Sequence, residues 1–206
     1  MAVTLYTIGH STHPTEKFIR LLKLHSITAI CDVRSAPYSR MNPQFNRETL
    51  RDTLKQSGIS YVFLGDELGA RSKDPACYRD GKVSYALVAK TSTFREGLER
   101  VKKGAENYKV ALMCAEKDPL QCHRTILVAR NLVREGVAVR HILADGGLET
   151  QEQAEERLLD QGKVTNADLF LSPDEILDQA YERQARAIAY EDERVGETEE
   201  NKAAMI

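Results

Sequence analysis

The sequence has no tryptophan, only four cysteines among its 206 residues, and no apolar run long enough to cross a bilayer. Its first residues also lack the basic region, apolar stretch and cleavage site of a secretory signal. We therefore expect a cytoplasmic protein that does not bind membranes. Because thiols stay reduced in that compartment, we expect the cysteines to matter through reactivity or packing and not through disulfides.

Two common nucleotide-binding fingerprints are also absent. The chain contains neither the G-x-G-x-x-G pattern of dinucleotide-binding folds nor the lysine motif of phosphate-binding loops, so we expect no NAD, FAD or ATP bound by those routes. It also lacks the paired C-x-x-C motifs typical of structural zinc sites. The sequence therefore assigns no cofactor and no metal.

Charge of neither sign is in large excess. The formal net charge is −2, and six acidic against two basic residues from Glu191 onward leave 27 basic and 25 acidic residues before that point. A body so close to neutral has no global field that attracts a polyanion. Nucleic-acid binding would therefore require a local basic patch.

The chain length fits one domain, and short apolar runs alternate with amphipathic stretches. This alternation predicts a single α/β domain over residues 1–165, with a mostly parallel five-stranded Rossmann-like sheet and flanking helices. A C-terminal helix within 166–190 should pack on the sheet edge, and 191–206 reads as a disordered acidic tail. The expected strands are residues 3–8, 28–33, 61–64, 109–113 and 137–143.

Two connections carry specific expectations. Asp118 and Pro119 have the chemistry of an N-cap and a first helical residue, which predicts a helix running to about Arg134. Residues 65–83 are rich in glycine and charge and too long for a simple turn, which is typical of a functional loop.

Ligands of parallel sheets bind at the carboxyl ends of the strands, and the most unusual cluster, CAEKDPLQCHR at 114–124, follows such an end. A strand, a short loop and a helix N-terminus form an anion site, to which Arg124 would add a bidentate clamp. The helix N-terminus would favour a thiolate at Cys114, but we expect burial in the strand and the neighbouring Glu116 to oppose it and to leave this thiol slow to react. The alternative interpretation is that Cys114 and Cys122 only pack in the core.

Two metal- or thiol-based mechanisms are excluded by spacing in this cluster. A phosphatase loop would need arginine where Leu120 stands. A zinc deaminase would need far more than two residues between Glu116 and Pro119. A different zinc site, made by Cys114, Cys122 and either His10 or His123, stays an alternative.

Two further clusters lie at predicted strand ends. In TIGHST, at 7–12, Gly9 permits close approach, while His10 and Ser11 offer a titratable ring and a hydroxyl. In DVRSAPYS, at 32–39, Asp32 stands in an apolar strand and needs a partner. It is either a structural orienter held by Arg34 or Arg124, or a general base or ribose-hydroxyl acceptor.

The loop after the second strand adds an aromatic and basic surface. Tyr38, Arg40 and Phe45 would there stack a planar ring and touch a phosphate.

The motifs TIGHST, DVRSAPYSR with NPQF, LGDELG, CAEKDPLQCHR and VRHILADG follow one another in this order. The series resembles the domain-of-unknown-function family number 488 over roughly residues 4–147. The resemblance implies a single α/β domain and no established reaction. The signature positions it implies are Gly9, His10, Ser11, Asp32, Arg34, Cys114, Glu116, Cys122, His123 and Arg124.

We therefore expect a small enzyme that binds an anionic small molecule or a nucleic-acid segment, such as a nucleotide or nucleoside, at the strand-end cleft. The reaction would be hydrolysis or transfer at a glycosidic or phosphoryl centre, with Asp32, Glu116 and His10 as the catalytic residues. Alternatives are a non-catalytic nucleic-acid-binding module and a cysteine-based metal or redox module. The expected ligand-binding residues are Gly9, Ser11, Arg34, Tyr38, Arg40, Cys114, Cys122, His123 and Arg124.

Overall fold

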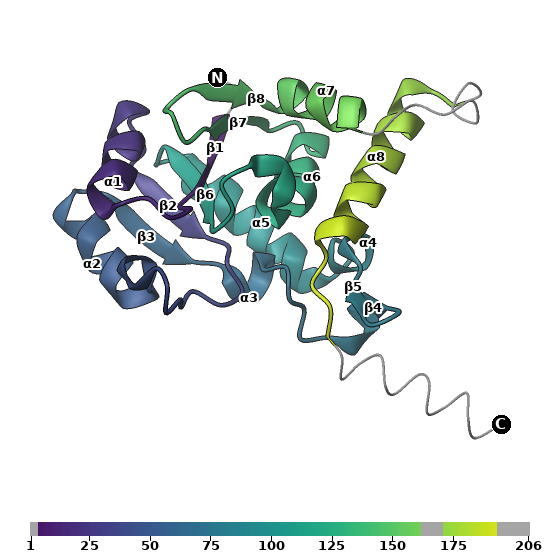
Figure 1. Cartoon of the computed structure of the whole chain (residues 1–206), viewed down its shortest axis with the longest axis horizontal. Coiled ribbons are helices and arrows are strands. Elements are labelled where there is room, and N and C mark those ends of the chain that lie inside the picture. The colour runs from purple at the N-terminus through teal and green to yellow at the C-terminus, as the bar shows by residue number, and fades with distance from the viewer. Residues whose placement is uncertain (1–3, 162–170, 193–206) are drawn as a thin grey trace.

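The computed structural model describes residues 4–161 and 171–192 (Figure 1). A six-stranded sheet lies at the centre, in the order β3-β2-β6-β1-β7-β8. Its first five strands along the chain are parallel, and β8 pairs antiparallel with β7. These strands are β1 (Thr4–Gly9), β2 (Ala29–Asp32), β3 (Ser60–Phe63), β6 (Val110–Cys114), β7 (Ala138–Ile142) and β8 (Leu148–Thr150).

The predicted α/β class and all five expected strands are confirmed, with β8 as an addition. This strand has only three residues and no apolar alternation, so its sequence carries no strand signal. It forms because a turn through Gly146, at a φ of 97°, returns the chain against β7. A separate hairpin joins β4 (Tyr78–Arg79) to β5 (Lys82–Val83).

Helices cover both faces of the sheet (Figure 1). One face is covered by α1 (Thr15–Leu24) and α2 (Arg47–Gln56), and the other by α5 (Ser92–Ala105), the π-helix η4 (Arg124–Ala129) and α6 (Arg130–Arg134). Two longer helices follow, α7 (Gln151–Gln161) and α8 (Pro173–Ile188). The short helices are η1 (Pro43–Phe45), α3 (Gly65–Leu68), η2 (Pro75–Cys77), α4 (Tyr85–Val88) and η3 (Pro119–Gln121).

Alternation along the strands divides the core into two clusters. Ile30 and Met113 face α1 and α2, whereas Cys31 and Leu112 face α5 and η4. Both sets are buried, as expected for parallel strands that are covered on both faces. Cys114 ends β6 on the α5 and η4 side.

Strand β6 is where a ligand site is expected from the topology. The helices after its neighbours β1 and β2 lie on one face of the sheet, while the helix after β6 lies on the other. Crevices between strands whose connections leave in opposite directions are the usual ligand sites of open α/β sheets.

The continuous helix predicted from Asp118 to Arg134 is wrong. Asp118 does cap a helix, since its carboxylate accepts from Leu120 N–H at 2.9 Å, but this 3₁₀ turn η3 ends at Gln121. Cys122 is extended at φ −142°, and its carbonyl accepts the first hydrogen bonds of a second helix, at 3.1 Å from the amides of Thr125 and Ile126. Cys122 is neither glycine nor proline, so the local sequence does not explain this break. We attribute it to burial, because the Cys122 side chain points into the core.

The C-terminal helix α8 is confirmed, but its expected place at the sheet edge is wrong. Strand β8 occupies the edge beyond β7, and α8 instead packs against helices. Arg130 of α6 stacks over the Tyr181 ring at 4.2 Å, and Gln184 donates to the Leu120 carbonyl at 2.8 Å. The boundary predicted at 165/166 lies outside the described residues.

The chain after α8 turns back onto the β4–β5 hairpin. Val83 N–H donates to the Tyr190 carbonyl at 2.9 Å, and Asp192 N–H donates to the Gly81 carbonyl at 2.8 Å. The start of the predicted disordered tail therefore contacts the body, and residues 193–206 lie outside the described part of the chain. Among the described residues, no helix combines the length and apolar character that a membrane span requires.

Gly9 provides the first test of this fold. A Cβ atom there would overlap the carbonyl oxygen of Glu116, because β1 and the turn after β6 approach backbone to backbone. We expect Gly9→Ala to lower the free energy of unfolding by about 1–3 kcal/mol or more. Gly104→Ala is the control, since a Cβ there meets nothing within 4 Å and should change stability by less than about 1 kcal/mol. Equal denaturation midpoints for the two variants would contradict the close approach.

Candidate functional site

A cavity of about 290 Å³ opens at the carboxyl ends of β2 and β6. Residues of β6 and the helix after it form one wall, and the loop after β2 forms another. The segment after α3, Tyr85 of α4 and the end of α8 with Tyr190 form the remaining sides. Its lining residues are Arg34, Ser35, Ala36, Ala70, Arg71, Tyr85, Cys114, Ala115, Glu116, Gln121, Cys122, His123, Ile188 and Tyr190.

Asp32 holds the arginine on this wall in place. Its carboxylate is fully buried and accepts from Arg34 Nε at 2.9 Å, Arg34 Nη2 at 2.6 Å and the Tyr61 hydroxyl at 2.7 Å. Arg34 Nη2 also donates to the Phe45 carbonyl at 2.8 Å. With both oxygens of Asp32 engaged, the geometry favours its orienting role over that of a general base.

His10 supports Arg34 from the other side. Its Nδ1 lies 2.8 Å from the Ser11 carbonyl, which only accepts, so Nδ1 carries the proton and Nε2 accepts from Arg34 Nη1 at 3.2 Å. The ring stacks on Phe45 at 4.3 Å. Burial lowers the pKa of His10 to about 4, so the ring is neutral at neutral pH and positions Arg34.

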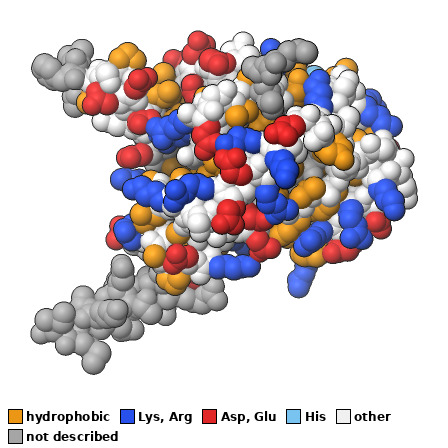
Figure 2. All heavy atoms as spheres, turned by 180° about the vertical axis from the view of Figure 1, so that it is seen from behind, with side chains coloured by type: hydrophobic (Ala, Val, Ile, Leu, Met, Phe, Trp, Pro, Cys, Tyr) orange, Lys and Arg blue, Asp and Glu red, His pale blue; other side chains and the backbone are white. Residues whose placement is uncertain are grey.

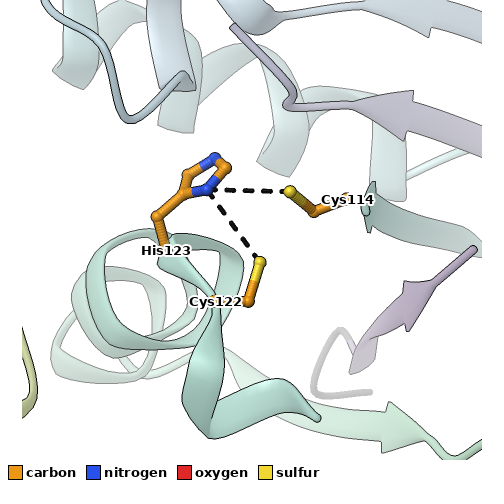
Figure 3. Close-up of side chains that lie close together, drawn as sticks. All are labelled: Cys114, Cys122 and His123. Carbon is orange, nitrogen blue, oxygen red and sulfur yellow. Dashed lines mark hydrogen bonds between the residues drawn. The ribbon is translucent and has the colours of Figure 1, made fainter. Parts of the chain in front are cut away.

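Two cysteines and a histidine that line the cavity lie close together (Figure 3). Cys114 Sγ lies 3.7 Å and Cys122 Sγ 3.9 Å from Nδ1 of His123. The other ring nitrogen, Nε2, lies 2.9 Å from the Val33 carbonyl. Cys114 ends β6, Cys122 precedes the second helix and His123 starts it, so the helix break brings the three side chains together.

The pKa values of the two thiols are shifted in opposite directions. The hydrogen bond to Cys122 and burial raise the pKa of Cys114. Burial also opposes ionisation of Cys122, but the hydrogen bond from Cys114, the charge of Arg124 and the contact with His123 together lower the pKa of Cys122. Cys122 is therefore the first thiol of the pair to ionise.

Arg124 lies beneath the cavity wall and does not line it. Its side chain is fully buried, and its Nη atoms donate to the carbonyls of Glu116 at 2.6 Å and Lys117 at 3.3 Å. Nε has no hydrogen-bond partner, and among the described residues no carboxylate forms an ion pair with Arg124. Arg124 therefore holds the 115–118 turn through its hydrogen bonds, and its positive charge favours ionisation of the two thiols.

The structure brings together most, but not all, of the other predicted site residues. Glu116 is exposed and lines the cavity, while Gly9 and Ser11 support the turn behind it, with Ser11 N–H donating to the Ala115 carbonyl at 2.8 Å. Tyr38 and Arg40 are exposed on their loop and outside the lining, and the Tyr38 hydroxyl donates to Glu48 at 2.9 Å. The predicted use of Phe45 as a stacking platform is wrong, because its ring is fully buried.

Sequence reasoning did not single out Tyr85, Ile188 and Tyr190 for the cavity. Arg71 also lines the cavity; it belongs to the glycine-rich segment expected to be a functional loop, and its guanidinium stacks over Tyr190 at 4.4 Å. Tyr190 had no signal, because its place depends on the path of α8 across the helices. Acidic and basic side chains are interspersed over the face drawn in Figure 2.

The fold and the site define a Rossmann-like α/β protein with a strand-end cavity that combines arginine, thiol and imidazole groups. The chain belongs to the family described as Domain of unknown function DUF488, whose model matches residues 14–131. The predicted family membership is confirmed. Neither the search of curated proteins nor the search of solved structures found a match.

The Asp32–Arg34 pair predicts a large stability effect. Asp32→Asn should lower the free energy of unfolding by about 3–5 kcal/mol, because it leaves a buried guanidinium without its counter-charge. Tyr61→Phe removes only one hydrogen bond to the same carboxylate and should cost about 1–3 kcal/mol. Urea denaturation measures both. A stable Asp32→Asn protein would instead favour the general-base role.

The buried histidines predict a pH dependence of stability. Burial lowers the pKa values of His10 and His141 to about 4, below the unfolded value of 6.5, so only the unfolded chain takes up these protons between pH 6.5 and 4. The free energy of unfolding should therefore decrease as the pH is lowered, by about 1.4 kcal/mol per pH unit for each histidine in that window. Urea denaturation between pH 6.5 and 5 measures the slope before most carboxylates titrate. His10→Asn should make it shallower, and adding His141→Gln should do so again; unchanged slopes would contradict the burial argument.

Proposed function

We propose that this protein is a small enzyme that binds an anionic ligand with a planar ring in the strand-end cavity. The reaction is hydrolysis or transfer at a glycosidic or phosphoryl centre, and the ligand class is a nucleotide or nucleoside derivative. The observation that carries the proposal is the presence of Arg34 and Arg71 on the walls of one cavity together with the Tyr190 ring.

The two arginines suit different parts of an anion. Arg34 is held by Asp32, His10 and the Phe45 carbonyl, so its guanidinium is ordered before a ligand arrives. Such preorganisation lowers the entropy cost of binding. Arg71 is exposed, and its guanidinium stacks on the Tyr190 ring without an ion pair to any of the described residues, so it is free to adjust to a phosphate or carboxylate.

The size of the cavity favours a small ligand over a nucleic-acid strand. A volume of about 290 Å³ is close to the lower end of small-molecule sites, roughly 300–1,000 Å³. A strand-binding module would need exposed stacking rings along a basic groove. Of the two rings predicted to stack bases, Phe45 is buried, and Tyr38 is exposed but lies outside the cavity lining, which gives that alternative less support.

We assign general acid/base catalysis to Glu116. Its side chain is exposed and lines the cavity, whereas both carboxylate oxygens of Asp32 already accept hydrogen bonds within the protein. Asp32 and His10 then act through Arg34 as positioning residues. Tyr38 and Arg40 would contact only the part of a ligand that extends beyond the cavity. Because all four cysteines are free thiols, we place the enzyme in the reducing cytoplasm.

Binding is tested by calorimetry with a nucleoside monophosphate and the matching nucleoside. We expect the monophosphate to bind more tightly, and Arg71→Ala to weaken its binding by about 10- to 100-fold, the equivalent of one charged hydrogen bond. The melting temperature should stay unchanged because Arg71 is exposed. Arg79→Ala is the matched control, an exposed arginine outside the cavity lining.

Catalysis is tested separately by following the release of base or phosphate. Glu116→Gln should slow the reaction by about 10²- to 10⁴-fold while ligand binding persists. Equal affinity for nucleoside and monophosphate would contradict the anion site. Tight binding of a single strand that weakens steeply with salt would favour the nucleic-acid module instead.

A further inference from the structure

The cluster of Cys114, Cys122 and His123 has a geometry that the anionic ligand does not explain. Two sulfur atoms face the same imidazole nitrogen, at 3.7 and 3.9 Å, and all three donor atoms lie within 4.8 Å of one another (Figure 3). A nitrogen lone pair accepts one well-formed hydrogen bond. A hydrogen bond to this nitrogen therefore accounts for one of these contacts but not for both.

The two sulfur–nitrogen separations are close to the edge length of a tetrahedral coordination sphere. With metal–sulfur bonds of about 2.3 Å and metal–nitrogen bonds of about 2.0–2.1 Å, tetrahedral angles put sulfur about 3.6 Å from nitrogen. The observed 3.7 and 3.9 Å lie within a few tenths of an ångström of that value. A single ion between the three atoms would satisfy them all.

The imidazole is already oriented for this task. Its Nε2 lies 2.9 Å from the Val33 carbonyl, which can only accept, so Nε2 carries the proton and Nδ1 presents its lone pair to the sulfurs. A ligating histidine usually donates its other N–H to a carbonyl or carboxylate in this way, which fixes the ring and its tautomer.

The donor set also selects the ion. Thiolates bind soft or borderline metals, and two thiolates with one imidazole at tetrahedral spacing suit zinc. Two thiolates, a neutral imidazole and Zn²⁺ form a unit without net charge, so the site adds no positive charge beside the buried Arg124.

We propose that Cys114, Cys122 and His123 bind a zinc ion whose fourth coordination position opens into the strand-end cavity. All three residues line that cavity, so a water or ligand atom would complete the tetrahedron there. Three protein ligands with one open position are typical of catalytic and not of structural zinc. The proposal rests on the donor geometry and does not depend on the anionic ligand.

The first test is the metal content of the full-length protein, produced with zinc in the medium and measured by mass spectrometry without added ligand. We expect one zinc per chain. Cys114→Ala, Cys122→Ala and His123→Ala should each bind zinc at least about 100-fold more weakly, since even the loss of an outer-shell contact costs 10- to 100-fold. The matched control is Cys31→Ala, a buried cysteine of β2 outside the cluster, which should keep its zinc.

The second test uses the wild-type chain alone, so it does not depend on the folding of any variant. The metal-free protein is titrated with Co²⁺, and a thiolate-to-cobalt charge-transfer band with tetrahedral visible bands is expected at one equivalent. Added imidazole should shift the visible bands by entering the open position.

Absence of both stoichiometric zinc and the charge-transfer band would overturn the metal site. Zinc retained by Cys122→Ala and His123→Ala but lost from Cys31→Ala would also overturn it. Visible bands that imidazole does not shift would overturn the open position. Since no anionic ligand is present in these measurements, a failure of anion binding leaves them unaffected.

Discussion

The site depends on one buried cation, Arg124, which holds the turn after β6. Its guanidinium donates to the carbonyls of Glu116 and Lys117 from a fully buried position, while Gly9 of β1 lets that turn approach the neighbouring strand. Carbonyl partners satisfy hydrogen bonds but carry no counter-charge. The same contact thus fixes the backbone at the sheet's switch point and raises the potential around Cys114 and Cys122.

The sheet separates two kinds of group that meet only at its carboxyl edge. Asp32 belongs to the α1 and α2 side, where it fixes Arg34, whereas Cys114 faces α5 and η4. Each set is stabilised within its own core, so a ligand in the cavity meets groups that are already ordered. This arrangement explains why charged and reactive side chains with little exposure contribute to one site.

The sequence was sufficient for the strands and for most of the cavity's chemistry, since apolar runs mark the strands and parallel strands bring their ends together. It was not sufficient where tertiary burial decides the backbone. Cys122 interrupts a helix that Asp118 and Pro119 correctly begin, because its side chain is drawn inward next to Arg124. Local propensity does not encode that preference. The sequence left open whether His10 or His123 would join Cys114 and Cys122, and the helix break is what places His123 beside both sulfurs.

The cavity is lined both by residues that the family model matches and by residues beyond the matched part of the chain. Arg34, Cys114, Cys122 and His123 fall within the matched residues 14–131, but Tyr190 reaches the cavity from beyond them. Tyr190 is placed by α8, which packs on the helix that begins after Cys122. In the proposed enzyme the shared part therefore supplies the reactive groups and Tyr85, and the C-terminal part adds Tyr190 as a second aromatic ring against the ligand.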